Sequence, residues 1–194
     1  MSKGTQTRDA VLEQAVEVAN RVGLSGLTIG SLAERAQMSK SGLFAHFRSK
    51  ETLQLQVLVF ARERFVELVV RPALRTPRGE PRVRKLFEGW LTCERDGAPC
   101  CLFLSATSEY DDQPGPVRDQ LASDHCDLMD AIARIVSGGT DEGHFRPDTE
   151  PEQFAQDLHG VMLAFFYAHR LLRQPEAEPR ARRAFETLLA AIRA

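Results

Sequence analysis

The residues best suited to binding chemistry lie within the segment 28–53. Leu43 and Phe47 stand four positions apart there, and residues at this spacing share one face of a helix and can point into a core. The residues left on the opposite face are Lys40, Ser41, Gly42, Phe44 and His46. Lysine and serine side chains bind phosphate oxygens and the hydrogen-bonding edges of bases. The spacing therefore predicts a surface that binds nucleic acid.

Two short helices are needed to present this surface. Thr28 is a suitable N-cap for a helix over 29–36, and Ser39 is one for a second helix that ends near Phe47. Residues 37–39 leave room only for a tight turn between them. A scaffold helix, a tight turn and a second helix with exposed N-terminal residues form a helix-turn-helix, in which the second helix enters the major groove of DNA.

The distribution of charge agrees with this prediction. The chain of 194 residues has a formal net charge of −2, which by itself disfavours binding to nucleic acid. Residues 1–50, however, hold seven lysines and arginines against four acids, a net charge of +3, whereas residues 51–194 hold 18 against 23, a net charge of −5. The predicted helix-turn-helix thus lies on the basic segment of an acidic chain.

Helical patterns run through the whole chain, and no segment alternates valine or isoleucine with polar residues over the length of a strand. Besides the two short helices and one over 10–22, we expect helices over 50–70, 82–96, 102–111, 116–137, 150–173 and 177–193. The helix over 50–70 should end there, because Arg71 precedes Pro72 and is pushed out of the helical conformation. The predicted fold is all-α, with a three-helix DNA-binding domain over 1–50 and a larger helical domain over 51–194.

The composition excludes several classes of protein. Hydrophobic residues make up 43% of the chain and charged residues 27%, which is ordinary for a globular protein. The longest uncharged run, near 160–168, is far shorter than the roughly 20 apolar residues that span a bilayer. The first residues contain no apolar core of a signal peptide. We therefore expect a cytoplasmic protein with no membrane partner.

Residues 8–58 resemble the N-terminal DNA-binding domain of TetR-family transcriptional regulators. The residues that carry the resemblance are Gly23, Thr28-Ile29, Leu32-Ala33, Ala36, Ser39-Lys40, Leu43-Phe44, His46-Phe47, Ser49-Lys50-Glu51 and Leu53. The resemblance implies DNA contacts from Thr28, Ser39, Lys40, Ser41, Gly42, Leu43, Phe44, His46 and Lys50. Among these, Thr28, His46 and Lys50 suit phosphate oxygens.

Lys40, Ser41 and Gly42 are the candidates for reading base edges or contacting the DNA backbone. Two other positions depart from the family pattern. Phe44 stands where tyrosine is usual, so a hydroxyl contact is lost and an apolar contact remains. Gln37 replaces the usual glycine of the turn, and a positive φ at that position would cost on the order of 1 kcal/mol.

The resemblance implies a ligand-responsive transcriptional regulator and not an enzyme. The expected partners are a palindromic, double-stranded DNA operator, a second copy of the chain and a small-molecule effector, with no cofactor. The expected action is repression that ends when the effector binds, with residues 51–194 holding the effector and the dimer contact. The long helix that starts at Lys50 would join the two domains.

Two apolar stripes near the C-terminus could form a four-helix interface with a second copy, as in the family. They consist of Phe154, Leu158, Val161, Met162 and Phe165, followed by Phe185, Leu188, Leu189 and Ile192. The alternative is that both stripes pack only within their own subunit.

An effector cavity would be lined by apolar side chains with a few polar groups. The candidates are Phe60, Trp90, Cys93, Phe103, Tyr110, Met129, Phe166 and His169. Most such residues are ordinary core residues, and this alternative applies to each of them.

The cysteines allow an alternative function, a redox or metal sensor of the same architecture. The residues concerned are Cys93, Cys100, Cys101, His125 and Cys126. No Cys-x-x-Cys spacing is present, so we predict no metal site, and without a secretion signal we expect reduced thiols.

An acidic cluster leaves a small helical enzyme as a further alternative. Glu109, Asp111 and Asp112 could carry out acid–base chemistry, but no nucleophile, phosphate-binding loop or metal motif accompanies them. A solvated start of a loop explains the cluster as well.

Overall fold

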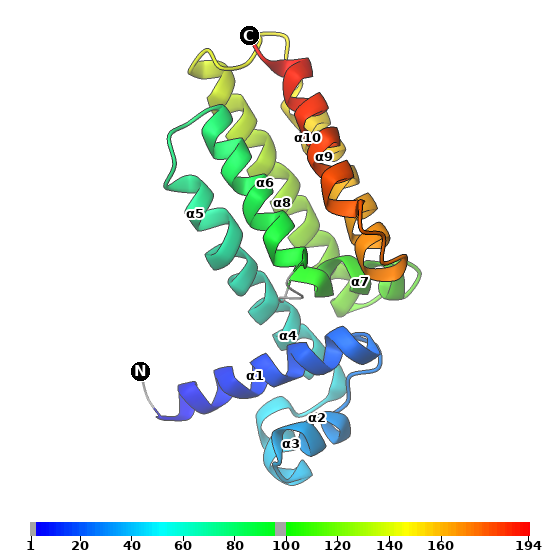
Figure 1. Ribbon diagram of the computed structural model, residues 1–194. Coiled ribbons are helices and arrows are strands. Elements are labelled where there is room, and N and C mark those ends of the chain that lie inside the picture. The colour runs from blue at the N-terminus through cyan, green and yellow to red at the C-terminus, as the bar shows by residue number, and fades with distance from the viewer. Residues whose placement is uncertain (1–2, 96–99) are drawn as a thin grey trace. The chain divides into compact units, whose positions relative to one another are not determined.

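The computed structural model describes residues 3–95 and 100–194, and the side chains of residues 8–95 and 102–194 (Figure 1). The described residues form helices and no strand. The helices are α1 (Lys3–Val22), α2 (Ile29–Ala36), α3 (Lys40–Phe47), α4 (Lys50–Phe65), α5 (Arg71–Leu74), α6 (Glu80–Arg95), α7 (Cys100–Tyr110), α8 (Pro116–Asp141), α9 (Pro151–Phe166) and α10 (Ala177–Ile192), with π-helical segments η1 (Val66–Val70) and η2 (Tyr167–Leu171). The all-α prediction is confirmed.

The chain divides into two units of packing. The first unit consists of Met1–Phe65 with Pro99–Ser123, and the second of Val66–Ala98 with Asp124–Ala194. Helix α7 and the first turns of α8 therefore pack with the N-terminal helices. The assignment of separate functions to residues 1–50 and 51–194 stays a prediction.

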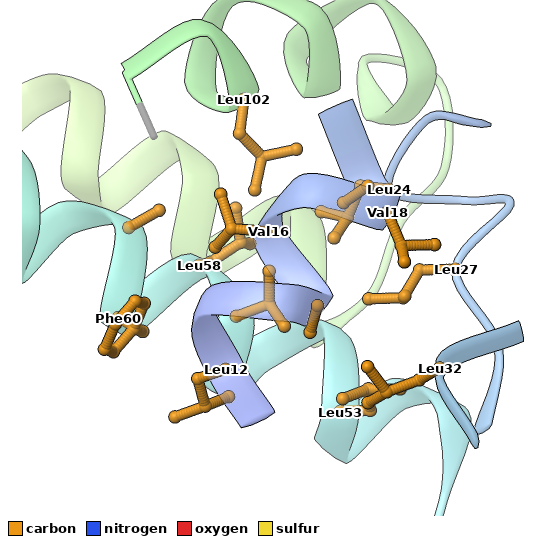
Figure 2. Close-up of a cluster of buried hydrophobic side chains, with 14 of the residues drawn as sticks. Leu12, Val16, Val18, Leu24, Leu27, Leu32, Leu53, Leu58, Phe60 and Leu102 are labelled. Carbon is orange, nitrogen blue, oxygen red and sulfur yellow. The ribbon is translucent and has the colours of Figure 1, made fainter. Parts of the chain in front are cut away.

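A continuous hydrophobic core holds the first unit together (Figure 2). Leu12 and Val16 of α1 contribute to it, together with Leu53 and Leu58 of α4 and Leu102 of α7. Removing such side chains from water stabilises a fold by about 1.5–3 kcal/mol each. Helix α2 packs on α1 and helix α3 packs on α4, while α1 and α4 in turn pack on α7, so the position of the two short helices depends on helices that are distant in sequence.

The chain stays helical from Lys50 to Leu74, beyond the end that the sequence predicted at residue 70. Pro72 lacks an N–H group, and within a regular α-helix its ring would collide with the carbonyl four residues earlier. The wider π-helical turn of η1 lies directly before α5 and changes the backbone spacing around that carbonyl. The prediction was wrong because a π-helical turn can accommodate a proline that an α-helical pattern excludes.

The second unit packs α10 against α6 and α9. The rings of Phe87 on α6 and Phe185 on α10 stack with centroids 3.9 Å apart. At the surface beside them, Arg84 donates to Glu80 at 2.7 Å and to Glu186 at 2.5 Å, and Arg193 donates to Glu80 at 2.6 Å. Apolar stacking and this ion-pair network therefore fasten the last helix to α6.

None of the helices formed by the described residues is long and apolar enough to cross a membrane.

The ion-pair network predicts an acid-sensitive second unit. Hydrogen bonds from Arg193 and Arg84 lower the pKa of Glu80 from 4.5 to about 2. A carboxyl group with a lowered pKa stabilises the fold above its unfolded pKa, and this contribution is lost as the pH falls from about 4.5 towards 2. In urea unfolding, the free energy of unfolding of Glu80→Gln should be ~1 kcal/mol lower than that of the unsubstituted chain at pH 7. Near pH 2 the two free energies should be equal.

Glu142→Gln is the matched control, because Glu142 is exposed and lies 3.8 Å from Arg78 in a single peripheral pair. A Glu80→Gln variant with the same pH profile as this control would contradict the account.

Candidate DNA-binding surface

Helix α2 begins at a reciprocal capping box. The backbone N–H of Ser31 donates to the Thr28 hydroxyl oxygen at 3.0 Å, and the backbone N–H of Thr28 donates to the Ser31 hydroxyl oxygen at 3.0 Å. Thr28 is exposed, so its side chain is also accessible to a partner. The predicted N-cap is confirmed, and it fixes where the first N–H groups of α2 point.

Helix α3 begins in a similar way at Ser39. The N–H of Gly42 donates to the Ser39 hydroxyl oxygen at 3.1 Å. A Cβ atom at Gly42 would lie 3.1 Å from the same oxygen, so a larger residue would crowd the cap. The absence of a side chain at Gly42 therefore protects the start of α3.

The turn between the two helices is strained at Gln37. This residue has φ 53° and ψ 37°, the left-handed conformation that glycine adopts most readily. The N–H of Met38 donates to the Ala33 carbonyl at 3.1 Å across this turn. The turn thus keeps the geometry that glycine would favour, as expected if the position requires a positive φ.

Helix α3 presents one polar and aromatic face to solvent. Lys40, Ser41, Phe44 and His46 are exposed, and Phe44 has 58% of its surface accessible. The expected contact by Leu43 is wrong, because this side chain is completely buried in the core of the first unit.

Lys40 and the start of α2 lie close together. Its Cε and Nζ atoms are 3.7 Å and 3.9 Å from the position that a Cβ atom would occupy on Gly30, and the Thr28 hydroxyl oxygen is 3.6 Å from that position. The ammonium group therefore lies beside the positive end of the α2 dipole, where a phosphate is favoured. Sequence reasoning missed Gly30 as the residue of α2 that Lys40 lies beside.

The other cations around the helix-turn-helix differ in their availability. Lys50 is exposed at the start of α4, where the helix dipole also favours an anion. Arg48 is exposed at the C-cap of α3. Arg35 donates to Glu17 at 2.8 Å, which neutralises much of its attraction for phosphate.

The acidic cluster is not assembled for acid–base chemistry. Both carboxylate oxygens of Glu109 accept hydrogen bonds from backbone N–H groups, at 3.1 Å from Leu24 and 2.8 Å from Ser25. Asp111 accepts from the N–H of Asp112 at 2.9 Å. These carboxylates stabilise turns of the first unit.

The cysteines do not form one group among the described side chains. Cys93 is disulfide-bonded, so the expectation of a reduced thiol is wrong there, and Cys126 is a free, exposed thiol. Cys100 and Cys101 lie outside the residues whose side chains are described. Within the described part of the chain, no three histidine, cysteine or acidic residues are placed to hold a metal ion.

The proposed effector-cavity residues are divided between the two units. Phe60, Phe103 and Tyr110 belong to the first unit. The members in the second unit are Trp90, Cys93, Met129, Phe166 and His169. Trp90 and Tyr110 are buried, in keeping with the alternative interpretation that these residues are core.

Two polar side chains that sequence reasoning missed, Glu94 and His159, lie beside Trp90, and His125, a sensor candidate from the sequence, lies beside His159. The indole N–H of Trp90 donates to Glu94 at 3.4 Å, and the His159 ring lies 6.0 Å from the Trp90 ring and 5.5 Å from the His125 ring. Burial, with a smaller contribution from His125, lowers the pKa of His159. These residues come from α6, α8 and α9, so only the folded chain brings them together.

Most of the two apolar stripes face the interior of their own subunit. The members that are buried within the second unit are Phe154, Leu158, Met162, Phe165, Phe185 and Leu189, in keeping with the alternative that the stripes pack within their own subunit. Val161, Leu188 and Ile192 are half-buried. The buried side chains of the two stripes lie where α9 packs on α10.

An open apolar groove lies on the outer side of these two helices. Gly160, Leu163 and Ala164 of α9 line it together with Ala184 and Leu188 of α10. Tyr167 and Leu171, which follow α9 in η2, are also exposed. Val161, Phe165 and Leu188, which belong to the predicted stripes, also line this groove.

The strained turn supports a prediction about stability. Replacing Gln37 by glycine removes a side chain that disfavours positive φ, and we expect the free energy of unfolding to rise by about 0.5–1 kcal/mol. Urea unfolding followed by circular dichroism measures this change.

Gln113→Gly is an informative comparison, because Gln113 is exposed and is not among the residues with positive φ. Glycine at that position should destabilise the chain or leave it unchanged. A decrease in stability for Gln37→Gly would show that the turn does not favour glycine.

Comparison with known proteins gives a consistent result for both parts of the chain. Residues 11–57 match the bacterial regulatory proteins of the tetR family, and residues 79–185 match the tetracyclin repressor-like C-terminal domain. The tetracycline repressor protein class C of Escherichia coli is 35% identical over 98 residues, which are 47% of this chain and 42% of that protein. The chain thus aligns with less than half the length of this curated relative.

Several solved structures have the same fold. A TetR-family transcriptional regulator from Cytophaga hutchinsonii has a TM-score of 0.86 at 20% identity, covering 100% of this chain and 98% of that one. A TetR transcriptional regulator from Chloroflexus aurantiacus has a TM-score of 0.85 at 22% identity, covering 100% and 99%. AibR, solved in complex with isovaleryl coenzyme A and operator DNA, has a TM-score of 0.68 at 21% identity, covering 83% and 85%.

Proposed function

This chain belongs to the tetR family of bacterial regulatory proteins, and from that premise we propose that it binds operator DNA as a homodimer and releases it when a small molecule binds. The observation that carries the DNA-binding part is the exposed face of α3 beside the capped start of α2. AibR was solved with operator DNA and an acyl coenzyme A, which supports the proposal by analogy of fold.

Phosphate binding is supported at two places on the first unit. Lys40 lies beside the N-terminus of α2 and the Thr28 hydroxyl, so a phosphate there would meet a cation, a hydroxyl and backbone N–H groups. Lys50 opens α4 and offers a second phosphate the same combination of cation and helix dipole. Contacts at both places would hold α3 in the major groove.

The exposed face of α3 would then contact the bases. Ser41 can donate to or accept from a base edge, and Phe44 can pack on the methyl group of thymine. A phenyl ring cannot donate a hydrogen bond to phosphate, so the proposed role of Phe44 is apolar.

The phosphate contacts can be counted from the salt dependence of binding. The probe is a duplex that the purified chain selects from a random-sequence library. Each phosphate contact contributes about −0.9 to the slope of log K against log salt. Lys40→Ala and Lys50→Ala should each weaken binding and make the slope about one unit less steep.

Lys85→Ala removes an exposed lysine of the second unit and should leave the slope unchanged. Selection of no duplex, or an equal effect of all three substitutions, would contradict the proposed surface.

A second copy of the chain is the proposed occupant of the groove on α9 and α10. The groove is apolar and open, Leu163 has 41% of its surface accessible, and Gly160 and Ala164 allow close approach of another helix. Two-fold pairing of helix-turn-helix proteins also matches the symmetry of a palindromic operator.

Leu163→Glu tests this arrangement, because two charges would be buried against each other in a symmetric contact. Sedimentation at micromolar concentration should show a dimer for the unsubstituted chain and a monomer for Leu163→Glu. Thr187→Glu adds the same charge at an exposed position of α10 outside the groove and should remain dimeric. A dimeric Leu163→Glu variant would exclude this face.

The proposed effector contact is the polar group around Trp90 in the second unit. Trp90, Glu94 and His159 offer hydrogen-bonding groups within an otherwise apolar set of helices, a combination typical of small-molecule sites. Trp90 is the single tryptophan of the chain, so its fluorescence reports on this region.

The disulfide of Cys93 supports one alternative to small-molecule control. A redox-controlled regulator would change its DNA affinity when this bond is reduced, because a constraint on the end of α6 would be lost. Equal affinities for the selected duplex with and without dithiothreitol would exclude this alternative.

A further inference from the structure

We propose that Glu109 is a positioning residue of the DNA-binding surface, which it holds in place through the turn between α1 and α2. This inference rests on the proposed function, and it assigns a role in DNA binding to a helix outside the helix-turn-helix. Glu109 lies in α7, some 60 residues after the recognition helix in sequence, and belongs to the same first unit.

The contact is bidentate and uses both carboxylate oxygens. The N–H of Leu24 donates to Oε1 at 3.1 Å and the N–H of Ser25 donates to Oε2 at 2.8 Å. Hydrogen bonds to a charged acceptor are about twice as strong as bonds between neutral groups. Two of them on successive amides restrain both the position and the direction of the turn.

The residue before the turn is shaped for this carboxylate. Gly23 has φ +82°, and a Cβ atom there would lie 2.7 Å from Oε2 of Glu109 and 3.0 Å from its Oε1. The carboxylate is the end of a flexible side chain, so it could move away, but that movement would break both hydrogen bonds. Gly23 therefore serves the backbone conformation and the contact at once.

Helix α4 holds the same turn from another side. The amide of Gln54, which is buried, donates to the Leu24 carbonyl at 2.7 Å. The N–H and the carbonyl of Leu24 are thus both bound by side chains, one from α7 and one from α4. The turn is therefore fixed relative to α7 and to α4.

This turn leads directly into the proposed phosphate sites. Thr28, the N-cap of α2, follows Ser25 by three residues, and Lys40 lies beside the start of α2. The other proposed phosphate site, at Lys50, belongs to α4 itself. Glu109 and Gln54 therefore help to set the spacing between two contacts that must meet DNA together, and such preorganisation lowers the cost of binding.

The experiment measures affinity for the duplex selected by the unsubstituted chain, at 15 °C, where circular dichroism shows each variant to be folded. We expect Glu109→Ala to bind about tenfold more weakly, with Glu109→Gln between it and the unsubstituted chain, because one amide oxygen can keep one of the bonds. Asp112→Asn loses the same charge at an exposed position nearby and should bind normally. The salt slope should not change, because no phosphate contact is removed.

Gly23→Ala provides a test that leaves Glu109 in place. Its added Cβ should displace the carboxylate and also strain the backbone at φ +82°, so it should weaken DNA binding at least as much as Glu109→Ala does. Because both changes break the same contact, the loss of affinity in the double variant should be smaller than the product of the two single losses. A loss equal to that product, about a hundredfold or more, would overturn the proposal.

Hydrogen exchange on the free protein provides a readout that needs no DNA. The amides of Leu24 and Ser25 should exchange faster in Glu109→Ala and Gly23→Ala, and unchanged exchange would show that the contact is not formed. Faster exchange with unchanged DNA affinity would mean that Glu109 only stabilises the fold, which overturns the positioning role alone.

If the unsubstituted chain selects no duplex, the proposed function and the positioning role both fail. If Glu109→Ala does not fold, the result rests on Glu109→Gln and Gly23→Ala.

Discussion

The burial of Leu43 and Phe47 is the interaction on which the rest of the DNA-binding surface depends. These side chains of α3 are almost completely removed from solvent, and their four-residue spacing fixes the rotation of the helix about its axis. Once that rotation is set, Lys40, Ser41 and Phe44 must face outwards. The burial of one face of α3 in the apolar core therefore also determines which residues form the proposed recognition face.

The same core explains why the helix-turn-helix does not stand alone. Leu102 and Tyr110 of α7 are buried in the core that also holds α1 and α4, and Glu109 adds polar contacts to the turn before α2. Apolar packing restrains distances, whereas the hydrogen bonds of Glu109 and Gln54 restrain the direction of the backbone. Together they keep the N-termini of α2, α3 and α4 in one arrangement, which a rigid partner such as duplex DNA requires.

Local rules predicted the parts of this arrangement that depend on neighbouring residues. The N-caps at Thr28 and Ser39, the beginnings of α2 and α4, and the strain at Gln37 all follow from interactions within a few positions. The end of the long helix was missed, because a π-helical turn accommodates Pro72. The apolar stripe around Phe154 and Leu189 was assigned to an interface, because periodicity identifies an apolar face but does not say whether the partner is the same chain or another. The proximity of Lys40 to Gly30, and that of Glu109 to Leu24, are tertiary contacts with no signal in a single sequence.

Hydrogen exchange with and without the selected duplex shows whether the exposed face of α2 and α3 binds DNA. In the complex we expect slower exchange at the first amides of α2, α3 and α4, since these would face bound phosphates, and little change in α9 and α10 at constant oligomeric state. Protection confined to another surface, or no protection at a duplex concentration that saturates binding, would show that DNA does not bind to this face.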